Sequence, residues 1–394
     1  MHFLFAVDSY DCKPSANGVC TKNIINALVH LGHSVSVICQ KRDNDIAQHS
    51  DQKIKISKVY YGYESKLEEK KINQKIINFV KKIRFIKNLF FFPVTNRSYV
   101  KAIFRKAEEI NKTEPVDIFV AVTQLVDHIE AGIFFTNKHK NTKLFIYSLD
   151  ALSSGYVLEL PKYKTYYKRK MRKYEIHALN KCHSFFAMRS HKKYIIEHPE
   201  IYKRFNNKIL FVDIPLFDLN KKNTPKEQTK KTIVYAGNTT YLDIHFLSKL
   251  FTIMDDYSFI FAGFYNDNFK KEVSKFKNVK LLGLISHEEA MKLQSTASHL
   301  LAFDTSSTSM IPGKIFEYFL TGKTVIFCTK NTDCHFIEYL NKYQNYILVH
   351  SEDKREQILT KIKPSKNCPD NVLEMFVENT PDYTAQLFIK TASL

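Results

Sequence analysis

A lysine and a glutamate one helical turn apart follow a Pro-Gly pair in the segment 311–327, I-P-G-K-I-F-E-Y-F-L-T-G-K-T-V-I-F. Pro312 suits the first turn of a helix, and Gly313 and Lys314 follow it directly. Free backbone N–H groups at a helix N-terminus favour an anion such as phosphate, and Lys314 adds positive charge there. Glu317 could accept hydrogen bonds from a sugar or ribose hydroxyl. The spacing therefore predicts a phosphate- and sugar-binding turn.

The residues around this turn predict the elements that would position it. An apolar run at 300–304 predicts a buried strand, and 305–309 is a polar loop. The helix then covers 314–320, Gly322 stands where a C′ glycine ends a helix, and a new strand starts at 324. An ordinary strand–helix crossover with a surface lysine and glutamate is the alternative interpretation.

The run P-G-K-I-F-E-Y followed by T-G-K-T-V-I resembles the donor-site segment of bacterial family-four-like glycosyltransferases of the GT-B fold. The resemblance implies an α/β chain with two facing Rossmann-like domains built on parallel sheets. It implies that Glu317 holds the nucleotide ribose, as part of the catalytic site, and that Pro312–Lys314 faces the diphosphate. It also implies transfer with retention, without a metal or other cofactor, and with a nucleotide-sugar as co-substrate.

The start of the chain resembles the opening of the same family. An apolar run at 3–7 predicts a strand, 20–31 has helical spacing, and 34–39 predicts a second strand. The pattern S-A-N-G-V before this helix matches a family loop that lies against the donor's diphosphate and sugar. Asn17 and Gly18 are the matching positions. A simple turn between strand and helix explains these residues equally well.

Asp150 follows a predicted strand at 144–148, at the carboxyl end of a parallel strand, where open α/β sheets bind ligands. The family often carries an acid or a histidine in this loop beside the reacting sugar, which implies a catalytic contact between Asp150 and the acceptor hydroxyl. A helix cap or turn aspartate is the alternative. His128 is a further candidate near another strand end, and Glu175 matches a helix position that is often acidic in the family, where we expect a structural role.

A second Rossmann-like domain is predicted to begin after the polar stretch 218–231. Its first strand, 232–236, ends at Gly237, which we expect to contact the donor. Many family members carry an Arg and then a Lys after this glycine, whereas this chain continues with Asn238 and has no cation nearby. Many also carry a second acid where this chain has Ser309. These departures leave the identity of the donor undetermined. They also keep open the alternative that the chain is a non-catalytic partner subunit.

Length and cysteine usage set the remaining bounds. A chain of 394 residues exceeds one ordinary core, and we predict an acceptor domain over 1–216, a nucleotide-sugar domain over 217–370, and a helix over 371–394 that crosses back onto the first domain. Seven scattered cysteines without a C-x-x-C pair favour a reducing compartment. Because the sequence shows neither a signal peptide nor a bilayer-spanning run, we expect a cytoplasmic protein.

The net charge of +19 is concentrated in residues 1–216, which carry 37 Lys and Arg against 20 Asp and Glu. Two tracts hold much of it, an amphipathic stretch at 66–106 and a tyrosine-rich stretch at 161–174. Basic amphipathic helices lie in membrane interfaces, and tyrosine suits the headgroup level. The tracts therefore predict contact with an anionic membrane on its inner face. Solvated helix faces are the alternative, and no nucleic-acid-binding motif accompanies the charge.

The functional prediction is a glycosyltransferase that moves a sugar from a nucleotide-sugar, expected to be a UDP-sugar, to a saccharide or lipid-linked acceptor in bacterial envelope polysaccharide synthesis, such as capsule or lipopolysaccharide. A sugar-nucleotide epimerase on the same architecture is an alternative, but it would need paired acids and a histidine around the sugar. A nucleic-acid-binding protein would leave the 311–327 segment unexplained.

Overall fold

The structure is a computed structural model of the chain, and it describes residues 1–10, 16–41, 54–61, 83, 87, 93, 95–149, 152, 164–217, 231–240, 242–304, 313–330, 337–362 and 372–394. The chain divides into two compact units. Unit 1 consists of Met1–Leu216 with Glu378–Leu394, and unit 2 consists of Phe217–Val377. Residues 372–377 thus belong to unit 2, whereas the predicted tail assigned everything from 371 onward to the first domain.

Unit 1 is built on a seven-stranded parallel sheet in the order β3-β2-β1-β4-β5-β6-β7. Its strands are β1 (His2–Val7), β2 (Ser34–Gln40), β3 (Ile54–Val59), β4 (Ile118–Val122), β5 (Lys143–Ser148), β6 (Ser184–Met188) and β7 (Ile209–Val212). Its helices are α1 (Ala16–His30), α4 (Arg97–Thr113), α5 (Val126–Lys138), α7 (Lys164–Lys181), η2 (Arg189–His191), α8 (Lys192–Glu197), α9 (Pro199–Tyr202), η3 (Lys203–Phe205) and α17 (Pro381–Ala392). Short η4 (Val377–Asn379) leads into α17.

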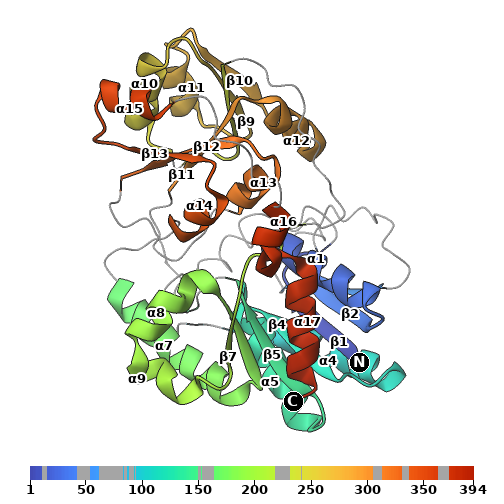
Figure 1. Cartoon of the computed structure of the whole chain (residues 1–394). Helices are drawn as coiled ribbons and strands as arrows, with labels where there is room; N and C mark the ends of the chain where they lie inside the picture. The colour runs from blue at the N-terminus through green and yellow to red at the C-terminus, as the bar shows by residue number, and fades with distance from the viewer. Residues whose placement is uncertain are drawn as a thin grey trace. The chain divides into compact units, whose positions relative to one another are not determined.

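Helices cover both faces of this sheet. Strands buried on both faces, such as β1 and β4, are therefore almost entirely apolar in sequence. One core contains Tyr99 and Ile103 of α4 together with Ile129 of α5. The other contains Leu28 of α1 and Phe388 of α17. Helix α17 packs alongside α1, so residues near both ends of the chain share one core (Figure 1).

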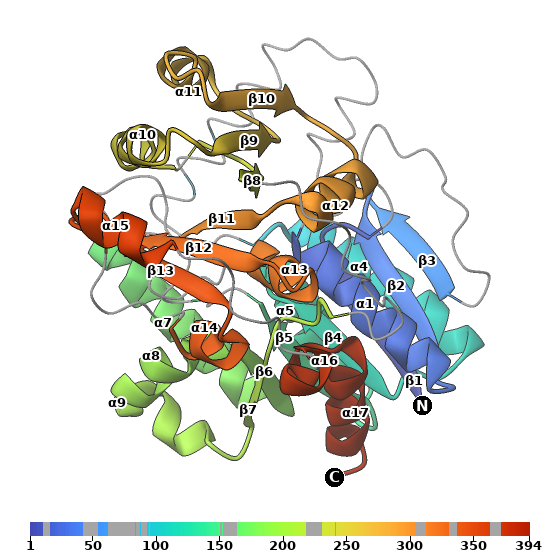
Figure 2. The same cartoon turned by 45° about the horizontal axis from the view of Figure 1, so that its top comes forward.

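Unit 2 is built on a six-stranded parallel sheet in the order β10-β9-β8-β11-β12-β13, and Figure 2 shows these strands in this order from top to bottom. Its strands are β8 (Thr232–Ala236), β9 (Ser258–Ala262), β10 (Val279–Gly283), β11 (His299–Phe303), β12 (Thr324–Thr329) and β13 (Tyr346–His350). Its helices are α10 (Ile244–Ile253), α11 (Asp267–Val273), α12 (His287–Thr296), α13 (Lys314–Leu320), α14 (Ile337–Tyr343), α15 (Arg355–Lys361) and α16 (Val372–Met375). Phe251, Phe259 and Phe261 lie at the centre of its core.

The predicted fold class is confirmed, since both sheets are parallel and both are connected by helices as in Rossmann-like domains. One local prediction in unit 2 is also confirmed. Gly322 follows α13 with a φ of 68°, the left-handed conformation of a C′ glycine. Ser286 and Glu289 form a capping box at the start of α12.

The two basic tracts differ in how much of them the structure describes. Most of 66–106 lies outside the described residues, apart from its end in α4, whereas most of the second tract forms the first half of α7. Among the described residues, no helix combines the length and the apolar character that crossing a membrane requires.

Candidate functional site

The strand order of unit 2 reverses between β8 and β11, which are neighbours in the sheet. The chain leaves β8 toward one edge and leaves β11 toward the other, so the segments that follow these two strands diverge. Ligands of open α/β sheets bind at this point, outside the carboxyl ends of the strands. Gly237 directly follows β8, and Asp304 directly follows β11. Both therefore lie where a ligand is expected.

Lys314, the first residue of α13, reaches this point. Its ammonium donates a hydrogen bond to the carbonyl oxygen of Ala236, the last residue of β8. A Cβ atom added to Gly237 would lie only 2.7 Å from the same nitrogen. Removal of water from around the ammonium lowers the pKa of Lys314, and the nearby Glu317 carboxylate partly offsets this. The structure thus brings Gly237, Lys314 and Glu317 together.

A buried tyrosine fixes α13 in this position. The hydroxyl of Tyr318 accepts a hydrogen bond from the backbone N–H of Ala236 at 3.2 Å. Both backbone groups of Ala236 are therefore bonded to α13, one by Tyr318 and one by Lys314. Phe316 and Phe319 on the same short helix are fully buried. The half-exposed Glu317 is consequently held on a helix that cannot rotate without breaking these contacts.

The carboxyl edge beside β8 is made of glycine backbone. The N–H of Gly237 donates to the oxygen of Ala262 at 2.7 Å, and the N–H of Gly263 donates to the oxygen of Gly283 at 2.7 Å. Gly263 has a φ of 131°, and a Cβ there would lie 2.1 Å from the oxygen of Gly237. The edge therefore needs glycine for its own packing, and it leaves backbone open to the close approach of a ligand. Sequence reasoning missed Gly263, although β8 and β9 both end in alanine and both are followed directly by glycine.

The loop after Gly237 is held by its own hydrogen bonds. The side-chain oxygen of Asn238 accepts from the backbone N–H of Thr240 at 2.9 Å and from its hydroxyl at 2.6 Å. The carbonyl oxygen of Asn238 accepts from the Tyr235 hydroxyl at 2.9 Å. Asn238 thus shapes the loop at a position where the resembled family often carries a cation.

Lys330 supplies a second cation at the carboxyl end of this sheet, and sequence reasoning missed it. It directly follows β12, is exposed, and forms an ion pair with Asp243, the N-cap of α10. Burial opposes ionisation of Asp243, but hydrogen bonds from Lys330 and from two backbone N–H groups hold the pKa of this carboxyl below its usual value. On the neighbouring strand end, Asp304 accepts a hydrogen bond from the Thr329 hydroxyl at 2.9 Å. A polar residue directly after an apolar strand was the available signal for both Asp304 and Lys330.

The predicted loop residues of unit 1 lie in a helix instead. Helix α1 begins at Ala16, so Asn17 and Gly18 occupy its first turn and not a glycine loop. The Asn17 carbonyl accepts a hydrogen bond from the Thr21 hydroxyl at 2.7 Å, one turn later. The apolar spacing in the sequence indicated only where the buried face of the helix begins. A helix can begin several residues before that point, so its first turn was not predicted.

The two other candidates of unit 1 within the described residues are buried. His128 is fully buried, its Nδ1 lies 2.8 Å from the Val122 oxygen, and its Nε2 lies 3.3 Å from the Tyr99 hydroxyl. Burial lowers the pKa of this imidazole. Glu175 is 3 % exposed and accepts a hydrogen bond from the Tyr202 hydroxyl at 3.0 Å, in keeping with the structural role expected for it.

Three predicted site residues, Asp150, Ser309 and Pro312, lie outside the described residues. Gly313 immediately precedes α13 and offers no side-chain cap. Within the described ranges, His, Cys, Asp and Glu side chains form no group of three that could hold a metal ion.

No protein-family model and no curated protein sequence matches the chain. Solved structures do match over its whole length. Sucrose-phosphate synthase from Thermosynechococcus elongatus aligns with a TM-score of 0.65 and 9% identity over 99% of this chain and 97% of its own. HepE from Anabaena, solved in complex with UDP, aligns with a TM-score of 0.61 and 14% identity over 100% of both chains. UDP-GlcNAc 2-epimerase from Methanocaldococcus jannaschii aligns with a TM-score of 0.54 and 13% identity over 99% of this chain and 100% of its own. These likenesses show that the chain has the GT-B fold.

Proposed function

We propose that this GT-B protein is a glycosyltransferase that uses a nucleotide-sugar donor, most simply a UDP-sugar. The observation that carries the proposal is the Lys314 ammonium at the end of β8, at the reversal of strand order, with Glu317 one turn along the same fixed helix. The sheet edge beside it is glycine backbone that a ligand can approach closely. The UDP bound to the structurally similar HepE supports a uridine donor.

In this proposal the donor's diphosphate lies against Lys314 and the backbone N–H groups near the start of α13, where Gly313 and Pro312 precede it. Lys330 offers a second positive charge at the same end of the sheet, in place of the cations that the resembled family carries after Gly237. Glu317 accepts hydrogen bonds from the ribose hydroxyls. Ser309 and the shaped loop at Asn238 complete the donor site.

The proposed reaction replaces the bond between the anomeric carbon and the diphosphate oxygen by a bond to an acceptor hydroxyl, with retention of configuration. The acceptor hydroxyl loses its proton and the nucleoside diphosphate leaves with the bonding electrons. Positioned cations and N–H donors stabilise the charge that develops on the leaving diphosphate. We assign Asp150 to the acceptor hydroxyl, and Asn17 and Gly18 of unit 1 to the sugar side of the donor.

We place the acceptor with unit 1 and propose a saccharide or lipid-linked saccharide of a bacterial envelope polysaccharide. The excess of positive charge in residues 1–216 supports a peripheral position on the inner face of the cell membrane, because anionic lipids attract basic segments by about 1 kcal/mol for each nearby cation. No metal is assigned a role.

Calorimetric titration with UDP, ADP and GDP tests the donor site directly. Lys314→Ala removes a charge-assisted contact to phosphate, which is worth about 1.5–3 kcal/mol, so we expect UDP affinity to fall by about tenfold to a hundredfold. Glu317→Ala should weaken UDP through the ribose, and Glu317→Gln less so. Lys280→Ala, at an exposed lysine on β10, is the matched control and should bind as the parent does. Equal UDP affinity in the parent and in Lys314→Ala would refute the site.

A non-catalytic GT-B partner subunit is the second candidate, because the described residues 237–240 and 242–248 after β8 include no Lys or Arg. Such a subunit would show no nucleotide binding in the same titration. A sugar-nucleotide epimerase, the activity of one structurally similar protein, would act on the nucleotide-sugar without any acceptor. Incubation of the protein with a nucleotide-sugar alone, followed by product analysis, separates these possibilities.

A further inference from the structure

Helix α7 carries an unusual concentration of positive charge. Its 18 residues, K-T-Y-Y-K-R-K-M-R-K-Y-E-I-H-A-L-N-K, include seven Lys and Arg and a single acid. That acid, Glu175, is buried and bonded to Tyr202 within unit 1, so it does not balance the surface charge. Six of the seven cations lie in the first ten residues of the helix.

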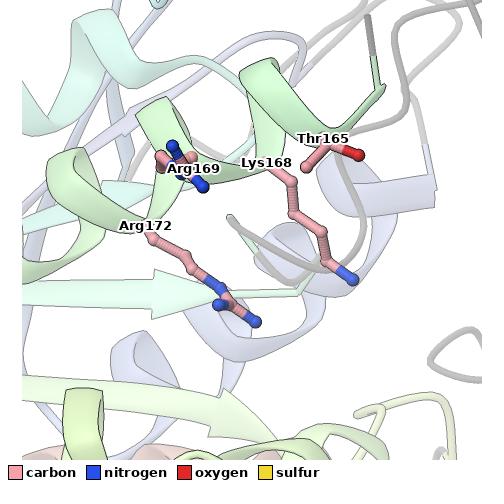
Figure 3. A pocket seen from close by; sticks show the side chains of 4 residues that line it. All are labelled: Thr165, Lys168, Arg169 and Arg172. Atoms are coloured by element: carbon pink, nitrogen blue, oxygen red, sulfur yellow. The ribbon is translucent and has the colours of Figure 1, made fainter. Parts of the chain in front are cut away.

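Part of this charge lines a concave pocket of about 370 Å³, whose lining among the described residues is Thr165, Lys168, Arg169 and Arg172 (Figure 3). The four residues are spaced i, i+3, i+4 and i+7, so they share one face of the helix. Figure 3 shows Lys168 and Arg172 extending to the same side of α7. The volume is within the range of roughly 300–1,000 Å³ that small-molecule sites occupy.

Contacts with α8 hold two of the cations in place. The Nε of Arg172 donates to the Tyr194 hydroxyl at 3.4 Å. The Lys168 ammonium lies 5.8 Å from the centroid of the Tyr194 ring. Among the described residues, no acidic side chain forms an ion pair with Lys168, Arg169 or Arg172. The pocket therefore presents three cations and one hydroxyl without a described counter-charge.

This arrangement opposes the stability of the helix itself. Like charges three and four residues apart repel each other by about 0.2–0.5 kcal/mol for each pair. Cations in the first half of a helix also face the positive end of its dipole. A bound anion removes both penalties at once, and guanidinium and ammonium groups form charge-assisted hydrogen bonds with phosphate oxygens. A local arrangement that costs stability is characteristic of a functional site.

We infer that the α7 pocket is a binding site for a phosphate or diphosphate group, held by Lys168, Arg169, Arg172 and the Thr165 hydroxyl. The group could belong to a free phosphorylated compound or to the headgroup of a phosphate-bearing lipid. The site belongs to unit 1 and does not depend on nucleotide binding by unit 2.

Titration with inorganic pyrophosphate tests the site in free solution. The experiment uses the full chain carrying Lys314→Ala, so that pyrophosphate binding in unit 2 is reduced. Lys168→Gln with Arg172→Gln in this background should lower pyrophosphate affinity by at least about tenfold. Lys173→Gln with Lys181→Gln removes the same charge from exposed positions of α7 outside the pocket and should leave the affinity unchanged. Circular dichroism confirms that each variant is folded.

Vesicles provide the second arm. Sedimentation with phosphatidylcholine vesicles that contain phosphatidylglycerol measures binding to lipid phosphate, with pure phosphatidylcholine as the reference. Loss of binding in the pocket variant in the pyrophosphate arm identifies a free phosphate ligand, and loss in the vesicle arm alone identifies a lipid headgroup. If the pocket variant and the exposed-position variant behave alike in both arms, the inference is overturned, whatever unit 2 does with nucleotides.

Discussion

At the scale of single residues, two glycines at the carboxyl edge of the sheet of unit 2 are required for different reasons. Gly237 is not among the residues with positive φ, but a Cβ there would meet the Lys314 ammonium at 2.7 Å. Gly263 has a φ of 131°, and a Cβ there would meet the backbone oxygen of Gly237 at 2.1 Å. A side chain can move aside whereas backbone cannot. Gly237 is therefore needed for the position of the Lys314 ammonium, and Gly263 is needed for the packing of the backbone itself.

This difference predicts opposite results for two alanine substitutions. Gly237→Ala should change the free energy of unfolding by no more than about 1 kcal/mol, and it should weaken UDP binding because Lys314 is displaced. Gly263→Ala should destabilise unit 2 by about 3 kcal/mol or more, through backbone strain and the clash. Chemical denaturation and UDP titration of both variants check this. A Gly237→Ala protein with unchanged UDP affinity would show that the position of the Lys314 ammonium does not matter for the donor.

At the scale of elements, α17 shows how the end of the chain stabilises unit 1. The ring of Phe388 lies 4.3 Å from that of Phe186 and 5.8 Å from those of Phe145 and Tyr147, measured between centroids. These three partners come from the neighbouring parallel strands β5 and β6, so one side chain joins the helix to two strands of the sheet. Phe388 is fully buried.

Phe388→Ala should therefore lower the stability of unit 1 by about 3–5 kcal/mol, since it removes a large buried ring and leaves a cavity. Gln386→Ala, at an exposed position of the same helix, should have little effect. Denaturant unfolding followed by circular dichroism measures both. UDP binding, which we assign to unit 2, should survive Phe388→Ala under native conditions. A variant as stable as the parent would mean that α17 does not contribute to the core of unit 1.

Element boundaries show where sequence reasoning reached its limit. The strand prediction at 232–236 is confirmed residue for residue, because an apolar run bounded by polar residues defines a buried parallel strand closely. The start of α1 was wrong by four residues, because the first turn of a helix need not carry buried side chains. That turn contains Asn17 and Gly18, so the error changed the local structure assigned to two site candidates.

At the scale of the whole molecule, each unit has its own sheet and core, and each contains a buried histidine. His191 belongs to unit 1, and burial lowers its pKa to about 4. His299 belongs to unit 2, and burial lowers its pKa to about 4 as well. In the described part of the chain, Nε2 of His299 has no hydrogen-bond partner.

These two histidines predict loss of stability in mild acid. Both pKa values are lower in the folded protein than the unfolded value of about 6.5, so below that pH the unfolded chain binds more protons. The stabilisation is complete above pH 6.5, decreases as the pH falls toward 4, and amounts to at most about 3 kcal/mol for each histidine. His299→Phe should remove the contribution of His299 and His191→Phe that of His191. The buried His128 of unit 1, whose pKa burial also lowers, should keep its own contribution in both variants. Denaturation of the parent and both variants at pH 7.5 and pH 5 measures the effect, and equal pH dependence in all three proteins would contradict it.

The sequence by itself determined the class of fold and the candidate chemistry of one segment. Alternating apolar strands and amphipathic helices require parallel sheets with covered faces, and the helix-start signals at 312–317 point to phosphate and sugar whatever surrounds them. Only the tertiary structure decided which distant residues join that segment. The strand order places β8 beside β11, so Ala236 meets Lys314 across 78 positions of sequence. It also places β8 beside β9, so Gly263 lies against Gly237. No local pattern contains that information, because which strands become neighbours depends on how whole faces pack and not on the residues near the site.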